Sequence, residues 1–160
     1  MIVNWKSQIK QGFSSDAMID FTDFYATFED ILNLDYQQSY GKSILPLMTN
    51  NNYNERDVLI TYYDPIWGDT SMGRGVYAQN KEYKLYKNGS FFNFSKDLYE
   101  KNPIDLSKLS ETENEIYSLL KTSLDSIPDL PEYNHNGWIE RRKQVNESRK
   151  FNNIWQLNTK

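Results

Sequence analysis

The stretch that decides the fold runs Tyr83-Lys84-Leu85-Tyr86-Lys87-Asn88-Gly89-Ser90-Phe91-Phe92-Asn93-Phe94. Asn88 and Gly89 tolerate the positive φ angles of a type I′ turn, so the sequence predicts a two-residue β-hairpin here. The flanking residues alternate between apolar and polar, which is typical of a sheet with one face on a core and one in water. Two more β-rich runs, 58–63 and 75–79, precede the hairpin. We therefore predict a small antiparallel sheet.

Two helices are predicted, one before the sheet in sequence and one after it. The first spans 20–34, and we interpret Asp20 and Asp23 as its capping carboxylates rather than as a metal site or an acid–base pair. The second spans about 110–127, begins with a capping box at Ser110 and Glu113, and should cover the sheet. The apolar stripes of the two helices are Phe21, Phe24, Tyr25, Phe28, Ile31 and Leu32, and Ile116, Leu119, Leu120, Leu124 and Ile127. The first stripe is so strong that it must pack on something large.

Composition limits the classes of function. The chain has 160 residues, 38% of them hydrophobic and 15% aromatic, which is typical of a packed domain. The net charge of -4 gives no reason to expect nucleic acid or an anionic membrane as a partner. The absence of cysteine excludes disulfides, thiolate catalysis and cysteine-based zinc sites. No apolar run approaches the ~18 residues of a membrane span, and residues 1–6 lack the apolar core of a signal peptide.

One loop carries the candidate binding residues. Residues 64–74 combine an aromatic ring, carboxylates and a guanidinium around Gly68, Gly73 and the adjoining Gly75. Trp67 can offer a flat surface to a sugar or aryl ring, and Arg74 can bind a sulfate or carboxylate through two hydrogen bonds. We predict Trp67, Arg74 and Asp64 as substrate-binding residues, against the alternative that the loop is a connector whose tryptophan packs on the sheet. His135 lies alone in a turn-like sequence, and no catalytic residue or metal ligand is predicted in this chain.

Several motifs in a fixed order resemble the C-terminal subdomain of the arylsulfatase family. They are Tyr63-Asp64-Pro65, Tyr83-Lys84-Leu85, Phe92-Asn93-Phe94, the segment from Asp97 to Glu100 and Asn102-Pro103. They are preceded by the segment 16–34, which contains the predicted helix, and by the linker-like Gly41-Lys42-Ser43-Ile44-Leu45-Pro46-Leu47. The resemblance covers about residues 1–127. It implies an α+β fold in which a C-terminal antiparallel sheet, covered by a helix, follows the last strand and helix of an incomplete α/β catalytic domain.

The resemblance also implies a division of the chain. Residues 1–40 would be the end of the catalytic domain, with a strand and the helix 20–34, and residues 41–57 would be a linker. Residues 58–127 would be the sheet subdomain with the helix 110–127, and 128–160 would form an irregular tail.

The activity implied by the family needs parts that this sequence does not contain. Such enzymes hydrolyse sulfuric esters with a formylglycine made from Cys or Ser in a Cys/Ser-x-Pro-x-Arg motif, assisted by calcium, and no Pro-x-Arg occurs here. We therefore expect a C-terminal sulfatase fragment that is inactive alone, with calcium and formylglycine in the full-length parent. Its partner would be the remainder of the catalytic domain, which is secreted or periplasmic in this family, and the parent's substrate would be a sulfated carbohydrate or an aryl sulfate.

Two other functions stay open at this level. The chain could be a stand-alone carbohydrate-binding module that uses its aromatic-rich sheet. It could also be a structural piece that associates with a separate catalytic chain. The apolar face of the helix 20–34 favours the fragment, because a self-contained module would not need a helix pointing at an absent sheet.

Overall fold

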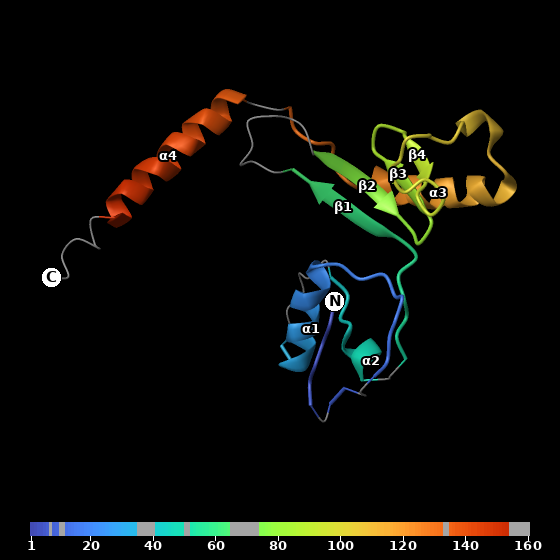
Figure 1. The fold of residues 1–160 in the computed structure, drawn as a ribbon, viewed down its shortest axis with the longest axis horizontal. Helices are drawn as coiled ribbons and strands as arrows, with labels where there is room; N and C mark the ends of the chain where they lie inside the picture. Colours follow the sequence, from blue (N-terminus) through green and yellow to red (C-terminus); the bar gives the residue numbers. More distant parts are fainter. Residues whose placement is uncertain are drawn as a thin grey trace.

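The computed structural model describes residues 1–6, 8–9, 12–34, 41–49, 52–64, 74–132 and 135–153. Its centre is an antiparallel sheet of four strands in the order β1-β2-β3-β4: Leu59–Tyr63, Gly75–Gln79, Tyr83–Tyr86 and Phe91–Asn93. The helix α3, Glu111–Asp125, packs on one face of this sheet (Figure 1). The predicted α+β arrangement is confirmed. None of the helices in these ranges is long and apolar enough to cross a membrane.

The hairpin lies where the sequence predicts it, but its turn is of another type. Leu85 pairs with Phe91, the Tyr86 amide donates to the Ser90 carbonyl at 2.9 Å, and the Gly89 amide donates to the Tyr86 carbonyl at 2.9 Å. Gly89 has a φ of 91°, whereas Asn88 does not have a positive φ. The loop is therefore the three-residue kind, a turn followed by a left-handed glycine, and the type I′ prediction is wrong. The Asn88 side chain favours this form by accepting a hydrogen bond from the Ser90 amide at 3.0 Å.

The core lies between the sheet and α3, and it follows the period-2 pattern of the strands. Its buried members are Val76, Ala78, Tyr83, Leu85, Phe91, Leu120 and Leu124. The Phe91 ring stacks on Tyr83 with 5.4 Å between centroids and meets Tyr117 edge-on at 5.5 Å. Leu119 was predicted on the buried stripe but is exposed. Leu119 directly precedes the buried Leu120, and successive residues of an α-helix point about 100° apart. Leu119 therefore lies on the flank of the helix, outside the contact with the sheet.

Both ends of α3 have specific partners. The capping box is confirmed, because the Glu113 amide donates to Ser110 Oγ at 3.3 Å and the Ser110 amide donates to Glu113 Oε2 at 2.9 Å. At the other end, Lys87 Nζ donates to the carbonyls of Leu124 at 2.8 Å and Ile127 at 2.5 Å. A cation from the hairpin thus satisfies carbonyls that the helix leaves without partners.

The N-terminal part holds two helices that pack together, α1 at Thr22–Ile31 and α2 at Leu45–Met48. α1 ends in a Schellman motif, with the Leu34 amide donating to the Glu29 carbonyl and the Asn33 amide to the Asp30 carbonyl. Asn33 takes the left-handed conformation that this motif requires, with a φ of 50°. Residues 1–6 form no strand, so the strand predicted within residues 1–40 is not found among the described residues of that range. The Trp5 carbonyl instead accepts from the Gln8 and Ile9 amides at 3.1 Å and 3.0 Å, which is a turn rather than a strand pairing.

Two further segments differ from their predicted structure. The predicted linker 41–57 contains α2 and holds several contacts to α1, described below. The predicted irregular tail contains α4, His135–Asn153, which projects away from the sheet (Figure 1). The pattern missed α4 because its Glu, Arg, Lys and Gln residues are good helix formers without an apolar stripe. The assignment of residues 1–40 to a catalytic domain stays a prediction.

Candidate functional site

The predicted substrate loop begins and ends at an ion pair. Asp64 and Arg74 lie just beyond the last pair of strands β1 and β2, Tyr63 with Gly75. Arg74 Nε donates to Asp64 Oδ1 at 2.7 Å, and Arg74 Nη2 donates to the Pro131 carbonyl at 2.6 Å. The Arg74 side chain is only 10% exposed. The structure thus brings two of the three predicted binding residues together, whereas Trp67 lies outside the described residues.

These contacts change what Arg74 can do. Its guanidinium already binds a carboxylate and a carbonyl, so an incoming sulfate would have to exchange with Asp64 or share the donors. The same contacts hold the two ends of the loop together and fix them to the segment after α3. A cavity of about 360 Å³ lies beside the pair, and it is lined by Arg74, Gly75, Val76, Tyr86, Lys87, Asn88, Asp129 and Leu130. Lys87 in this cavity faces Asp129 at 3.7 Å.

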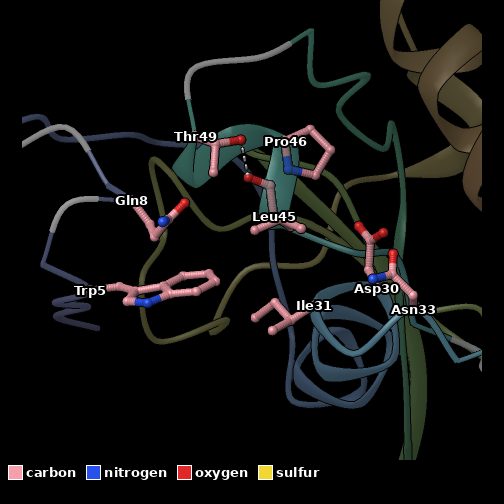
Figure 2. A pocket seen from close by; sticks show the side chains of 8 residues that line it. All are labelled: Trp5, Gln8, Asp30, Ile31, Asn33, Leu45, Pro46 and Thr49. Carbon is pink, nitrogen blue, oxygen red and sulfur yellow. Dashed lines mark hydrogen bonds between the residues drawn. The ribbon is translucent and has the colours of Figure 1, made fainter.

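A larger open cavity lies between the end of α1, α2 and the turn that follows Trp5 (Figure 2). Its volume is about 630 Å³. Figure 2 shows Trp5 and Gln8 on one side of the space and Asp30 and Asn33 on the other. The sequence did not indicate this site, because its residues come from segments up to 44 positions apart, from Trp5 to Thr49.

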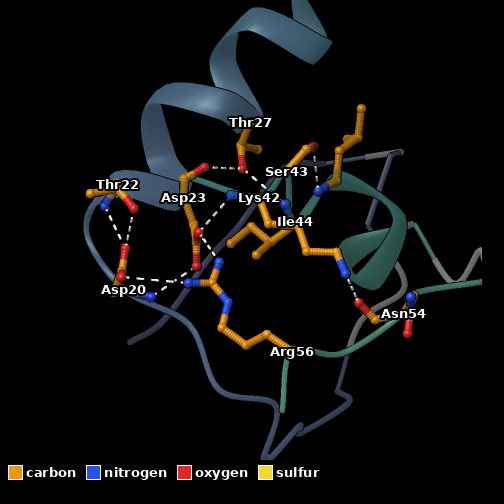
Figure 3. A network of polar contacts seen from close by, with 10 residues as sticks. Asp20, Thr22, Asp23, Thr27, Lys42, Ser43, Ile44, Asn54 and Arg56 are labelled. Atoms are coloured by element: carbon orange, nitrogen blue, oxygen red, sulfur yellow. Dashed lines mark hydrogen bonds and ion pairs between the residues drawn. The ribbon is translucent and has the colours of Figure 1, made fainter. Parts of the chain in front are cut away.

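The capping carboxylates of α1 are also the centre of a buried polar network (Figure 3). Asp23 is completely buried, and it accepts from the Lys42 amide at 2.8 Å, from the Asp20 amide at 2.8 Å and from the Arg56 guanidinium. Asp20 accepts from the Thr22 amide at 2.7 Å. The N-cap of α1 is Phe21, which has no side-chain cap, so Asp20 is not the N-cap that the sequence predicts. Both carboxylates still accept from backbone amides at this end of the helix, and they are bound by internal donors rather than placed for acid–base work. The sequence did not indicate that Arg56 belongs to this network, because no motif around it points to a contact with Asp23, 33 positions away.

Gly41 explains how the chain comes close enough to join this network. A Cβ atom at this position would lie 2.0 Å from the Thr22 carbonyl oxygen. Only glycine permits that approach. The Ile44 amide then donates to Thr27 Oγ1 at 3.0 Å, so the segment after Gly41 runs along the polar side of α1.

The face of the sheet away from α3 carries a lysine among aromatic rings. Lys84 Nζ lies 4.8 Å from the Tyr77 ring centroid and forms an ion pair with Glu100. Tyr86 donates its hydroxyl to the same carboxylate at 2.5 Å. Burial, followed by the hydrogen bond and charge of Glu100, raises the pKa of Tyr86 well above its usual range. Tyr86 therefore stays protonated and serves as a hydrogen-bond donor rather than a base.

Calcium does not fit the residues that the structure describes. In those ranges no three His, Cys, Asp or Glu side chains converge on a common point. The carboxylates of Asp20 and Asp23 are both paired with Arg56.

Comparison with known proteins gives a likeness in fold. No family model matches the sequence, and no curated protein matches it. A solved structure is similar: BT4656, determined in complex with its substrate D-glucosamine-2-N,6-O-disulfate, with a TM-score of 0.54 and 21% identity. The match covers 69% of this chain and 25% of that chain, so our chain spans about a quarter of its length. The small sheet with its helices resembles the C-terminal region of a sulfatase.

Proposed function

We propose that this chain is the C-terminal part of a sulfatase-like enzyme that hydrolyses sulfuric esters, and that it supports the fold and the substrate cleft of that enzyme. The fold likeness to BT4656 supports the proposal, as does the coverage of only 25% of that structure. The arylsulfatase-like motifs of the sequence support it independently of the fold likeness.

The observation that carries the proposal is the inverted burial of α1. Phe28 of the helix and its flanking residues Phe21 and Leu32 are 60%, 89% and 63% exposed. Phe24 and Ile31 of the same apolar stripe are half-buried. The buried residues of the helix are instead polar: Asp23, Thr27 and Glu29. A helix normally buries its apolar stripe, and burial of each such side chain is worth about 1.5–3 kcal/mol. We propose that the remainder of the catalytic domain covers this face.

The role of the chain in catalysis is then to shape the site rather than to react. We propose that the loop 64–74 contacts the substrate, with Trp67 offering its ring. Because Arg74 binds Asp64 and Pro131, its contribution would come mainly from holding the loop ends in place. Formylglycine and calcium would belong to the remainder of the enzyme, which would be periplasmic or secreted.

The substrate class to test first is a sulfated sugar. BT4656 binds D-glucosamine-2-N,6-O-disulfate, and an aromatic ring in the loop suits a sugar as well as an aryl group. An aryl sulfate is the second class, because the arylsulfatase motifs alone do not separate the two.

The experiment compares this chain with a longer protein. The coding DNA upstream of the chain is sequenced, and both the chain and any longer product are assayed with calcium on a chromogenic aryl sulfate and on D-glucosamine-2-N,6-O-disulfate. We expect an in-frame Cys/Ser-x-Pro-x-Arg motif, turnover by the longer protein and none by the chain. Turnover by the chain alone, or an upstream frame without the motif, would overturn the proposal.

A carbohydrate-binding module is the alternative that a specific observation favours. Tyr77, Tyr86 and Phe92 lie on the face of the sheet away from α3, with 5.3 Å and 6.0 Å between successive ring centroids. Tyr77 and Tyr86 are half-buried and Phe92 is buried, so the two tyrosines are the rings that a sugar could reach. If the chain binds immobilised polysaccharide by itself, and Tyr77→Ala abolishes the binding, this alternative replaces the fragment. If instead it associates with a catalytic polypeptide encoded elsewhere, it is a structural partner.

A further inference from the structure

The open cavity of about 630 Å³ at the end of α1 has no part in the proposed function. It is lined by Trp5, Gln8, Asp30, Ile31, Asn33, Leu45, Pro46 and Thr49 (Figure 2). These residues divide into an apolar group and a hydrogen-bonding group, which is the composition of small-molecule sites. Its volume also falls within the usual range for such sites, roughly 300–1,000 Å³.

The apolar group is built around Trp5. The indole is 38% exposed, and it reaches the same cavity as Ile31 and Leu45. A flat indole at the edge of an open cavity gives a stacking surface for the C–H face of a pyranose ring. Aliphatic side chains opposite such a ring would exclude water from its other edge.

The hydrogen-bonding group lies mainly at the C-terminal end of α1. Asp30 Oδ2 accepts from Ser43 Oγ at 2.7 Å, a contact that orients the carboxylate and leaves its Oδ1 to accept another donor. Asn33 takes the left-handed conformation at the end of the helix, where the Schellman motif fixes its backbone, and its side-chain amide lines the cavity. The Gln8 amide adds a donor and an acceptor from the facing turn.

The electrostatics of the cavity select the charge of the ligand. Asp30 is the charged side chain among the described residues that line it, and it is negative. The carbonyl end of the ten-residue helix α1 adds partial negative charge at the same place. A sulfate or phosphate group is therefore disfavoured here, and an ammonium group is favoured.

We infer that this cavity binds an unsulfated amino sugar. Its ring stacks on Trp5, its ammonium group pairs with Asp30, and its hydroxyls bond to the amides of Gln8 and Asn33. The inference rests on the cavity of the 160-residue chain, and its test does not depend on the proposed function. It would provide a site for a sugar without sulfate groups, apart from any site that takes a sulfated one.

The test is an NMR titration of the ¹⁵N-labelled 160-residue chain. The probes are D-glucosamine with its amine protonated, D-glucose, cyclohexylamine and D-glucosamine-2-N,6-O-disulfate. We expect saturable shifts of the Trp5 indole and the Asn33 side-chain amide with D-glucosamine, weaker binding of D-glucose and of cyclohexylamine, and no saturable binding of the disulfate at this cavity.

Three variants assign the contacts. Trp5→Ala should weaken D-glucosamine binding about tenfold, the size expected from loss of one aromatic contact. Asp30→Asn should reduce D-glucosamine to the affinity of D-glucose. Asn33→Gly keeps the positive φ that the helix end requires while removing the amide, so it tests binding even if Trp5→Ala disturbs folding. Tyr99→Ala, an exposed aromatic residue in the turn after β4, is the matched control and should change nothing.

The outcomes separate the inference from its competitors. Equal binding of cyclohexylamine and D-glucosamine would reduce the site to a cation pocket and overturn the assignment of a sugar. Saturable binding of the disulfate at Trp5, or no saturable shift with D-glucosamine, would overturn it as well. Sulfatase assays do not enter this test, so its failure would leave the proposed function untouched.

Discussion

Lys87→Met should destabilise the sheet and α3 because Lys87 joins them by charge rather than by apolar contact. Its Nζ donates to two carbonyls at the end of α3, those of Leu124 and Ile127, at 2.8 Å and 2.5 Å. The side chain is 26% exposed. Methionine keeps most of the aliphatic stem but removes the donors and the charge.

The size of the effect follows from these contacts. Each hydrogen bond to a charged group contributes about 1.5–3 kcal/mol, and a cation at a helix C-terminus adds about 0.3–1 kcal/mol. Water can reach part of this site and solvate the freed carbonyls, so the contributions do not simply add. The ion pair with Asp129 adds little, because Asp129 is 85% exposed. We expect a loss of about 2–3 kcal/mol in the free energy of unfolding.

Urea denaturation followed by near-ultraviolet circular dichroism measures this loss. With a slope of about 1–3 kcal/mol per molar urea, the midpoint should fall by about 1–2 M. Lys121→Met is the matched control, because Lys121 pairs with Asp125 on the exposed side of the same helix at 2.9 Å. Such exposed pairs contribute about 0.3–0.5 kcal/mol. Equal midpoint shifts for the two variants would refute the assignment of Lys87 as the partner of the helix end.

Two further predictions concern the other charged contacts. Hydrogen bonds from the Ser110 amide and hydroxyl lower the pKa of Glu113 below its usual 4.5. The stabilising contribution of the Glu113 carboxylate is therefore present above pH 4.5 and is lost as the pH falls through the folded-state pKa. The difference in unfolding free energy between the protein and Glu113→Gln should shrink in acid, and a constant difference across the titration would contradict this. Arg56→Ala leaves the buried Asp23 carboxylate without its cation, a change that costs about 3–5 kcal/mol of stability. Amide hydrogen exchange should therefore accelerate in α1 and at Ile44 but not at Leu85. The control Lys81→Ala removes exposed pairs with Glu55 and Asp16, and it should leave exchange in both regions unchanged.

Part of the fold could be predicted because its signals are local. The hairpin depends on Gly89, which alone in the turn needs a positive φ, and the start of α3 depends on Ser110 and Glu113 three positions apart. Even there, the turn type was wrong, because Asn88 bonds to the Ser90 amide instead of taking a left-handed conformation. Local propensity placed the turn, and a side-chain hydrogen bond selected its geometry.

The candidate site was predicted less completely. Asp64 and Arg74 were identified as members of one loop, but the pairing of their side chains was not, and the contact of Arg74 with Pro131 spans 57 positions. The cavity beside Trp5 gave no signal, because α1, α2 and the N-terminal turn form it only when they pack together. Nothing in the residue spacing reveals which side chains will share a cavity.

What the sequence alone determined about this protein is the set of helices and strands that carry an apolar period or a cap, including the apolar stripe of α1. Only the tertiary structure showed that Phe21, Tyr25, Phe28 and Leu32 of this stripe are exposed and that the opposite side of α1 is buried around Asp23. The reason is that Arg56 and the Lys42 amide, 33 and 19 positions away, bind a carboxylate that the sequence pattern places at a helix end. The spacing of apolar residues shows which side of a helix is suited to burial. The segments of the chain that pack against the helix determine which side is actually covered.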